Sequence, residues 1–186
     1  MGKKLSEMSL EELWRLFPIS LKKHQACWQE WYEEERELLQ KILPATAKIH
    51  HIGSTAIPDI WAKNIVDILV ETPTADGFSV CKTALMDNGY ICMAEEENRL
   101  SFNKGYTENG FADRVFHLHL RADGDCDDLY FKEYLLRNPE VAKAYETLKL
   151  SLWKAYEFDR DGYTNAKTEF VQTYTQKAKA LYNTEP

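Results

Sequence analysis

Apolar and polar positions along this chain predict helices first, then a group of strands, then helices again. Residues 9–17 form a predicted short helix, in which Ser9 is the N-cap and Glu12 completes a capping box. Residues 22–43 repeat apolar side chains at helical spacing and stop before Pro44, which predicts one long amphipathic helix.

The middle of the chain has the pattern of strands. Predicted strands occupy residues 46–52, 64–71, 90–95, 99–105 and 114–122. We expect a helix at residues 78–89 and a loop at residues 106–113. The last strand alternates strictly, so one face is apolar and the other carries His117, His119 and Arg121.

The remainder of the chain is helical. Its pattern predicts helices at residues 124–138, 139–158 and 159–182. This segregation of helices and strands predicts an α+β fold with a mixed sheet of about five strands, flanked by N-terminal and C-terminal helices. We expect a single domain over residues 1–186, with a helix plus sheet core at 22–123 and a helical part at 124–186.

Composition and charge narrow the classes of function. The chain has 23 basic and 30 acidic residues and a net charge of -7, so we expect no nucleic-acid partner. A local pocket can still be basic and take a small anion. The four cysteines form no Cys-x-x-Cys motif, and no apolar run is long enough to span a bilayer. We therefore expect a cytoplasmic protein with reduced thiols and no membrane partner.

Asp67 interrupts the apolar strand at residues 64–71. Burying a carboxylate costs free energy unless a cation or hydrogen bonds compensate, so Asp67 either pairs with Lys63 or Arg121 or holds something positive. Glu71 shares its face of the strand, although we expect Glu71 at an exposed strand end. Because Mg²⁺ takes one or two carboxylates plus phosphates, Asp67 is a candidate catalytic residue and metal ligand.

A turn at Gly53, Ser54 and Thr55 lies shortly ahead of Asp67 and is a candidate phosphate-binding site. Glycine lets backbone approach a phosphate closely, and the N–H groups of a turn can form an anion-binding nest. A turn that holds phosphates, followed by an acid that holds a metal, is the logic of nucleotidyl transfer.

Several motifs together resemble those of the GrpB family. They are HIGSTAIPDIWAKNIVDILV, FHLHL, LYFKEYLLRNPEVAKAYETLKLSL and YTNAKTEFV, and they span most of the chain from Trp28 to Val171. The resemblance implies a nucleotidyltransferase-like topology of the sheet. It also singles out Lys167 in the last motif as a candidate phosphate contact. Because family members occur fused to dephospho-coenzyme A kinase, it implies a link to the coenzyme A pathway.

The chain departs from the family and superfamily patterns at three positions. Leu69 stands where nucleotidyltransferases carry a second acid, which weakens a two-metal mechanism. Asp59 replaces a glycine and Asn64 replaces a proline of the family pattern, so we expect a differently shaped turn.

The strand at residues 114–122 offers further ligands. His117 and His119 are candidate metal ligands with Asp67, although imidazole suits Zn²⁺, Mn²⁺ or Fe²⁺ better than Mg²⁺. The alternative is that both histidines hydrogen-bond to backbone or to tyrosines. Arg121 and Lys63 are candidate phosphate contacts, because a guanidinium or ammonium group neutralises phosphate.

Together these features predict a metal-dependent nucleotidyltransferase. It would bind a nucleoside triphosphate or another phosphorylated small molecule with Mg²⁺ or Mn²⁺ and transfer a nucleotidyl group to an unknown acceptor. One alternative is a catalytically impaired module that binds a nucleotide or a coenzyme A-pathway molecule, or that helps folding. Another is a metal-binding protein that uses its histidines.

Overall fold

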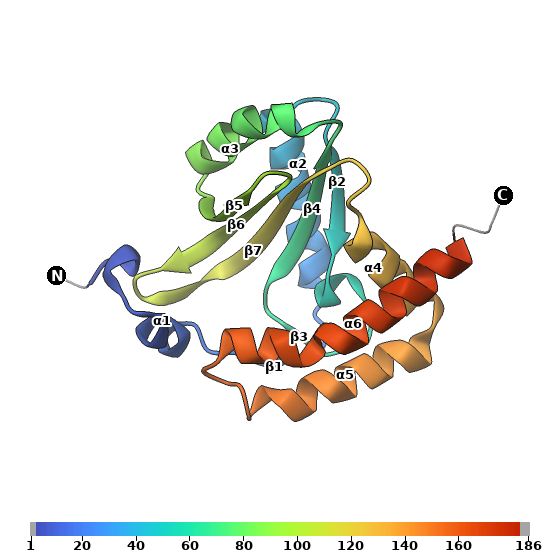
Figure 1. Ribbon diagram of the computed structural model, residues 1–186. Coiled ribbons are helices and arrows are strands. Elements are labelled where there is room, and N and C mark those ends of the chain that lie inside the picture. Colours follow the sequence, from blue (N-terminus) through green and yellow to red (C-terminus); the bar gives the residue numbers. More distant parts are fainter. Residues whose placement is uncertain (1–2, 183–186) are drawn as a thin grey trace.

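The computed structural model describes residues 3–182 and is built around a five-stranded mixed sheet (Figure 1). The strands follow the order β2-β4-β7-β6-β5. Their bounds are β2 Lys48–Ile52, β4 Val66–Thr72, β5 Ile91–Glu96, β6 Arg99–Thr107 and β7 Gly110–Ala122. The β4–β7 pair is parallel, and the other three pairs are antiparallel. A separate short pair joins β1 Leu21–Lys22 to β3 Ala62–Lys63.

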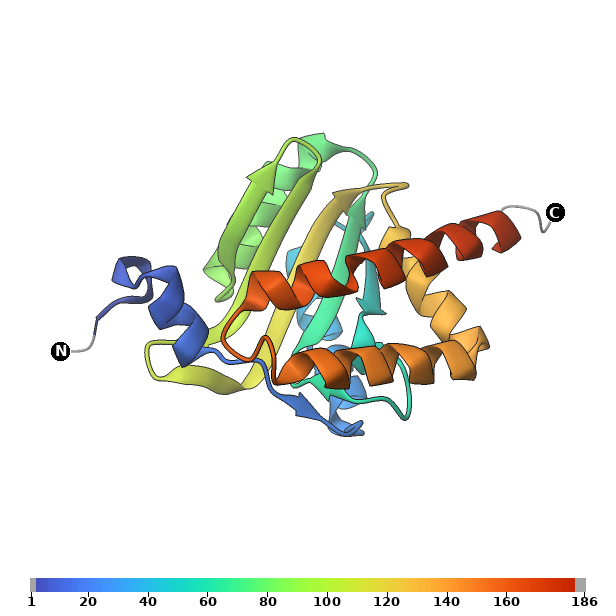
Figure 2. The same ribbon diagram turned by 60° about the horizontal axis from the view of Figure 1, so that its bottom comes forward.

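Helices cover both faces of this sheet. They are α1 Leu10–Leu16, α2 Cys27–Ile42, α3 Phe78–Asp87, α4 Asp127–Arg137, α5 Pro139–Trp153 and α6 Arg160–Tyr182, with 3-10 turns η1 Leu5–Glu7, η2 Ser54–Ala56 and η3 Ala75–Gly77. Helices α2 and α3 pack on one face, while α4, α5 and α6 lie on the other (Figures 1 and 2). The predicted α+β class, with a mixed sheet of five strands and flanking helices, is confirmed.

The main core lies between the sheet and helices α2 and α3. Alternate residues of β4 and β7 supply its sheet side, including the fully buried Ile68 and Leu118. Trp28 anchors α2 to this core and donates its indole N–H to Asn64 Oδ1 at 2.8 Å. Because strand side chains alternate, the same packing turns Asp67 toward the opposite face.

A second apolar cluster holds the C-terminal helices together. Tyr145 of α5, Leu135 of α4 and Phe170 of α6 pack against the loop residues Ile57 and Ile60. This cluster fixes the three helices over the loop that follows the 53–55 turn. None of the described helices is long and apolar enough to cross a membrane.

Three predictions about local structure need correction. The long helix begins at Cys27 rather than at residue 22, because Leu21 and Lys22 pair with β3 as a strand. Residues 106–113 are not a loop but the closing end of the β6–β7 hairpin. Glu71 is not an exposed strand end: it is buried, and its Oε2 lies 3.1 Å from His50 Nε2 on the neighbouring strand.

The loop before β4 keeps the backbone that glycine would adopt. Asp59 has a positive φ of 59° and is the non-glycine residue with positive φ in the described part of the chain. Asp is among the side chains that tolerate this region. Lys143 of α5 donates to the Asp59 carbonyl, which ties the loop to the helix. Aspartate thus takes a left-handed backbone at the position of the family's glycine.

Candidate functional site

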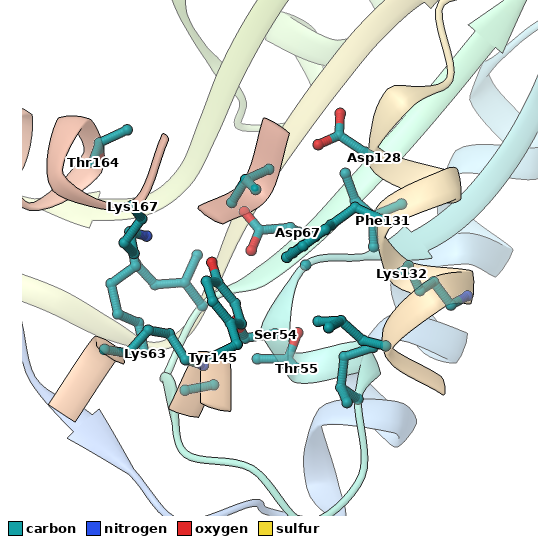
Figure 3. Close-up of a pocket in the computed structure, with 18 of the residues that line it drawn as sticks. Ser54, Thr55, Lys63, Asp67, Asp128, Phe131, Lys132, Tyr145, Thr164 and Lys167 are labelled. Carbon is teal, nitrogen blue, oxygen red and sulfur yellow. The ribbon is translucent and has the colours of Figure 1, made fainter. Parts of the chain in front are cut away.

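A cavity of about 280 Å³ lies between the polar face of the sheet and helices α4, α5 and α6. The turn at residues 53–55 forms one wall, and Asp67 projects into the cavity from β4. Figure 3 shows Lys63 and Lys167 on one side of Asp67 and Asp128 on the other. Segments far apart in the sequence therefore meet around one carboxylate.

Gly53 fits closely against this carboxylate. Its φ of 70° and ψ of -172° fall in a region that is essentially restricted to glycine. A Cβ atom at Gly53 would lie 2.5 Å from Asp67 Oδ2. The turn and the strand acid are thus in direct contact, and any side chain at position 53 would displace the carboxylate.

A chain of polar contacts reaches Asp67 through His117. Arg160 Nη2 donates to the Tyr106 hydroxyl oxygen at 2.9 Å, and this oxygen lies 2.8 Å from His117 Nε2. Because a guanidinium only donates, the Tyr106 proton is free to point at His117 Nε2. The His117 proton is then on Nδ1, which lies 3.4 Å from Asp67 Oδ1.

His119 approaches the same carboxylate oxygen from a second direction. Arg121 Nη2 lies 3.3 Å from His119 Nδ1, and arginine is always protonated, so Nδ1 must accept. The His119 proton is therefore on Nε2, 3.9 Å from Asp67 Oδ1. Both imidazoles present an N–H group to one oxygen, which leaves Asp67 Oδ2 as the free acceptor.

These contacts set the charge of the site. Burial raises the pKa of Asp67, but the contacts with His117 and His119 outweigh burial and hold this pKa well below its usual range. Burial lowers the pKa of His117 below its ordinary value, although Asp67 opposes the shift. At neutral pH the site therefore combines an ionised Asp67 with a neutral His117.

Three lysines gather around this acid. Burial lowers the pKa of Lys63 to about 8 and the pKa values of Lys149 and Lys167 to about 7, and repulsion among the cationic groups adds to the effect. Within residues 3–182, none of the three lies within 4.0 Å of a carboxylate. An anionic ligand would relieve the repulsion and supply the missing negative charge.

Two of these lysines are held in place by aromatic rings. Lys149 Nζ lies 4.8 Å from the centroid of the Tyr145 ring and also donates to the Trp61 carbonyl. Lys167 Nζ lies 4.3 Å from the centroid of the Tyr163 ring. Cation–π contacts of this kind stabilise an ammonium group without neutralising its charge. The lysines are thus positioned but remain available to an anion.

The lining of the cavity is locally basic in an acidic protein. It contains four lysines, the fourth being Lys132 of α4, but only two acids, Asp67 and Asp128. Burial raises the pKa of Asp128, and the charge of Asp67 raises it further, although His119 opposes these effects. A chain with a net charge of -7 therefore concentrates positive charge at one internal site.

The turn offers a limited set of donors. The N–H groups of Ala56 and Ile57 donate to the carbonyls of Gly53 and Ser54. The Thr55 hydroxyl lies 3.0 Å from Nε2 of the buried His51, so it is engaged within the protein. The Ser54 hydroxyl is in hydrogen-bond contact with Tyr145. A ligand in the cavity can therefore receive a hydrogen bond from one of these two hydroxyls or from the first N–H groups of the turn.

Comparison with known proteins decides the family. The sequence model described as "GrpB protein" matches residues 18–177, which is most of the chain. The chain belongs to the GrpB family. The predicted resemblance is thereby confirmed.

Individual relatives agree with this assignment. UPF0157 protein YqkA of Bacillus subtilis is 33% identical over 156 residues, which cover 82% of this chain but only 45% of YqkA. Glutamate-rich protein GrpB of Alkalihalophilus pseudofirmus is 32% identical over 160 residues, covering 82% of this chain and 91% of that protein. The crystal structure of conserved protein GrpB from Enterococcus faecalis superposes with a TM-score of 0.76 at 29% identity, covering 88% and 99% of the two chains. This chain thus spans less than half the length of YqkA.

Most of the predicted site residues meet in this GrpB-family structure. The cavity is lined by Gly53, Ser54, Thr55, Lys63, Asp67, His119 and Lys167. His117 lies behind Asp67 and supports it through Oδ1. Arg121 is a correction: it does not line the cavity, because its guanidinium donates to the carbonyls of Leu100 and Leu120 at 2.9 Å.

Sequence reasoning missed Lys149, Tyr145 and Asp128. Tyr145 and Lys149 occupy the Tyr-x-x-Leu-Lys part of the motif that resembles the family, so this motif held the signal. Asp128 lies in the first turn of α4, where acidic residues are common because they interact favourably with the helix dipole. Its position in the sequence therefore gave no sign of a site. The first two lie on one face of α5, since they are four residues apart.

The site fits a divalent cation only in part. Within the described residues, no group of three or more His, Cys, Asp or Glu side chains is arranged to hold a metal ion. The N–H directions argue against His117 and His119 as metal ligands, because each imidazole turns a proton rather than a lone pair toward Asp67. Asp67 Oδ2 remains, which suits Mg²⁺ or Mn²⁺ bound by one carboxylate plus ligand phosphates.

Proposed function

We propose that the cavity binds the phosphates of a nucleoside triphosphate together with Mg²⁺ or Mn²⁺, as in a nucleotidyltransferase. The observation that carries the proposal is the cluster of Lys63, Lys149 and Lys167 beside Asp67, without a carboxylate partner within the described residues. The chain belongs to the GrpB family, and the nucleotidyltransferase-like topology that the resemblance to this family implies supports the same class of function.

Each group has a defined task in this proposal. The lysines neutralise the phosphate oxygens, and Ser54 donates a hydrogen bond to them. Asp67 would hold the divalent cation, which supplies charge neutralisation and orientation when bound. Because the protein contributes no covalent step, it acts by positioning and by electrostatic stabilisation.

The transfer itself is an in-line displacement at phosphorus. An acceptor oxygen or nitrogen forms a bond to the α-phosphorus while the bond from this atom to the oxygen bridging to the β-phosphate breaks. Pyrophosphate leaves with the electron pair of the broken bond, and the proton of the acceptor passes to water. The lysines of the cavity stabilise the charge that develops on the leaving pyrophosphate.

A second candidate function is nucleotide or coenzyme A binding without turnover. The observation in its favour is Leu69, which occupies the usual position of the second acid and is completely buried. A two-metal mechanism would then lack one of its bridging ligands. The link of the family to a coenzyme A pathway makes coenzyme A a useful second titrant.

Calorimetric titration separates the two candidates. We expect ATP, GTP or CTP to bind with an affinity that increases when Mg²⁺ or Mn²⁺ is present, and this increase should vanish in Asp67→Asn. Nucleotide or coenzyme A binding that is indifferent to metal would favour the second candidate. Absence of binding by every phosphorylated titrant would contradict the proposed function.

A charge-removing variant tests the lysine cluster directly. Lys167→Met keeps a long side chain but removes the ammonium group, and loss of one charged hydrogen bond should weaken nucleotide binding about tenfold or more. The matched control is Lys177→Met, which changes an exposed lysine of the same helix that does not line the cavity. Equal effects of the two variants would show that the cavity is not the binding site.

A further inference from the structure

A second and larger hollow lies next to the phosphate cavity. This groove has a volume of about 590 Å³ and is formed between α1, the edge strand β5, the floor strands β6 and β7, and the start of α6. Figure 2 shows that α6 crosses the sheet at one end of β6 and leaves the β5–β6 side uncovered by helices α4 to α6. The volume is within the range of about 300–1,000 Å³ that is typical of small-molecule sites.

The walls of the groove are apolar and accessible. Leu10 and Leu13 line it from α1, and Ile91 and Met93 line it from β5. Leu10, Ile91 and Met93 are 64%, 43% and 58% exposed, which is unusual for neighbouring large apolar side chains. Trp14 adds an aromatic surface to the same wall.

The floor is polar, and part of it is satisfied within the protein. Tyr106 and His117 contact each other at 2.8 Å, and Arg160 donates to Tyr106 at 2.9 Å. Asn103 and Asp161 also line the groove and can contact the polar end of a ligand. The apolar walls favour an aliphatic or aryl group for the rest of that ligand.

The groove and the phosphate cavity share part of their lining. Lys63, Tyr163 and Thr164 border both of them. Tyr163 is 1% exposed, and its hydroxyl is buried without a hydrogen-bond partner among the described residues. An unsatisfied hydroxyl of this kind is costly, and a polar ligand atom at the junction would satisfy it.

We propose that the groove holds the apolar body of the acceptor, an alcohol or amine with an aliphatic or aryl group. Its nucleophilic end lies at the junction, beside Lys63, Tyr163 and Thr164, where it meets the nucleotide phosphates. This inference rests on the proposed function and names the acceptor class for it. The acceptor and the nucleotide then occupy adjoining sites and bind at the same time.

The probe is 1-anilinonaphthalene-8-sulfonate, which combines an aryl body with a polar group. Met93 and Met86 are 58% and 50% exposed, but Met93 lines the groove whereas Met86 of α3 does not. We expect the probe to slow oxidation of Met93 by hydrogen peroxide about tenfold at saturation and to leave Met86 unchanged, as measured by mass spectrometry. Met93→Glu should weaken probe binding about tenfold, whereas Val80→Glu, at an exposed position on α3, should change it less than about twofold.

The decisive step repeats the experiment with saturating ATP and Mn²⁺. Continued protection of Met93 in the presence of bound nucleotide supports the inference. Displacement of the probe by nucleotide would overturn it, because the groove would then belong to the nucleotide site. Unchanged oxidation of Met93 would also overturn it. Failure of nucleotide to bind would contradict the proposed function instead, since protection of Met93 by the probe alone does not depend on nucleotide.

Discussion

At the scale of single residues, the contacts with His117 and His119 keep Asp67 ionised. Two imidazoles direct protons at Oδ1, and each imidazole is oriented by its own arginine, directly or through Tyr106. The other oxygen, Oδ2, faces Gly53 and the cavity. The carboxylate is therefore preorganised, and substitutions around it should change the site without touching a ligand.

The first prediction concerns the close approach of Gly53. Gly53→Ala should lower the free energy of unfolding by about 1–3 kcal/mol, because the backbone there is restricted to glycine and the new Cβ would meet Asp67 Oδ2. Chemical denaturation measures the loss. Gly77→Ala is the control, since its φ is negative and no atom lies within 4 Å of the added Cβ. Equal stability of the two variants would contradict the described contact.

The second prediction concerns the tautomer of His117. In the unmodified protein, ¹⁵N NMR should show the His117 proton on Nδ1. Tyr106→Phe removes the hydroxyl donor to Nε2, so the population with the proton on Nε2 should increase. Tyr174→Phe serves as the control, because Tyr174 is remote from His117. If the His117 proton is on Nε2 in the unmodified protein, the proposed donation from the Tyr106 hydroxyl to Nε2 is wrong.

At the scale of elements, the register of β4 and β7 builds the site. The parallel pairing places Asp67 opposite His117 and Leu69 opposite His119, so both histidines flank one acid. Shifting β7 by one residue against β4 would turn His117 and His119 toward the core and away from Asp67. Helix α1 is a separate case, because it contributes one wall of the groove but no buried residue.

The third prediction tests whether α1 is part of the cooperative fold. Ser9 accepts from the Glu12 N–H at 3.2 Å, and the Glu12 carboxylate accepts from the Ser9 N–H at 2.7 Å. Loss of this capping box in Ser9→Ala should lower the free energy of unfolding by about 1 kcal/mol. Ser79→Ala, at an exposed position inside α3, should change it little. If thermal and chemical unfolding are identical for both variants, α1 unfolds independently of the rest.

The sequence pattern predicted most helices and strands correctly, but it did not predict where each of them begins and ends. Alternation in the strand at residues 114–122 identified the core face, and Pro139 marked the start of a helix, as the structure has it. The start of α2 was placed too early, because the pairing of Leu21 and Lys22 with β3 is a long-range effect. The role of Arg121 was also beyond reach, since alternation gives a face of the strand but not the partner on a neighbouring strand.

At the scale of the whole molecule, the charge of the cavity opposes the charge of the protein. Net charge of -7 repels a polyanion at long range, whereas four cavity lysines attract it at short range. Salt should therefore weaken both the long-range repulsion and the short-range attraction of a polyanion. The lysine pKa values near 7 and 8 also place their titration in an accessible pH range.

The fourth prediction is the pH dependence of nucleotide binding. A bound polyanion raises the pKa values of Lys149 and Lys167, so binding takes up protons when part of these groups is neutral in the free protein. Affinity should therefore fall as pH rises from 7 to about 9. Calorimetry of ATP binding at pH 8, in two buffers of different ionisation enthalpy, measures the uptake directly. Proton release, or affinity that is independent of pH, would contradict the role of these lysines.

The most direct test of the central claim is a crystal structure of the protein with ATP and Mn²⁺. We predict triphosphate density between the 53–55 turn and the ammonium groups of Lys63, Lys149 and Lys167, with Mn²⁺ against Asp67 Oδ2. Nucleotide density elsewhere on the molecule, or a cavity closed by an ion pair between Asp67 and one of these lysines, would contradict the account.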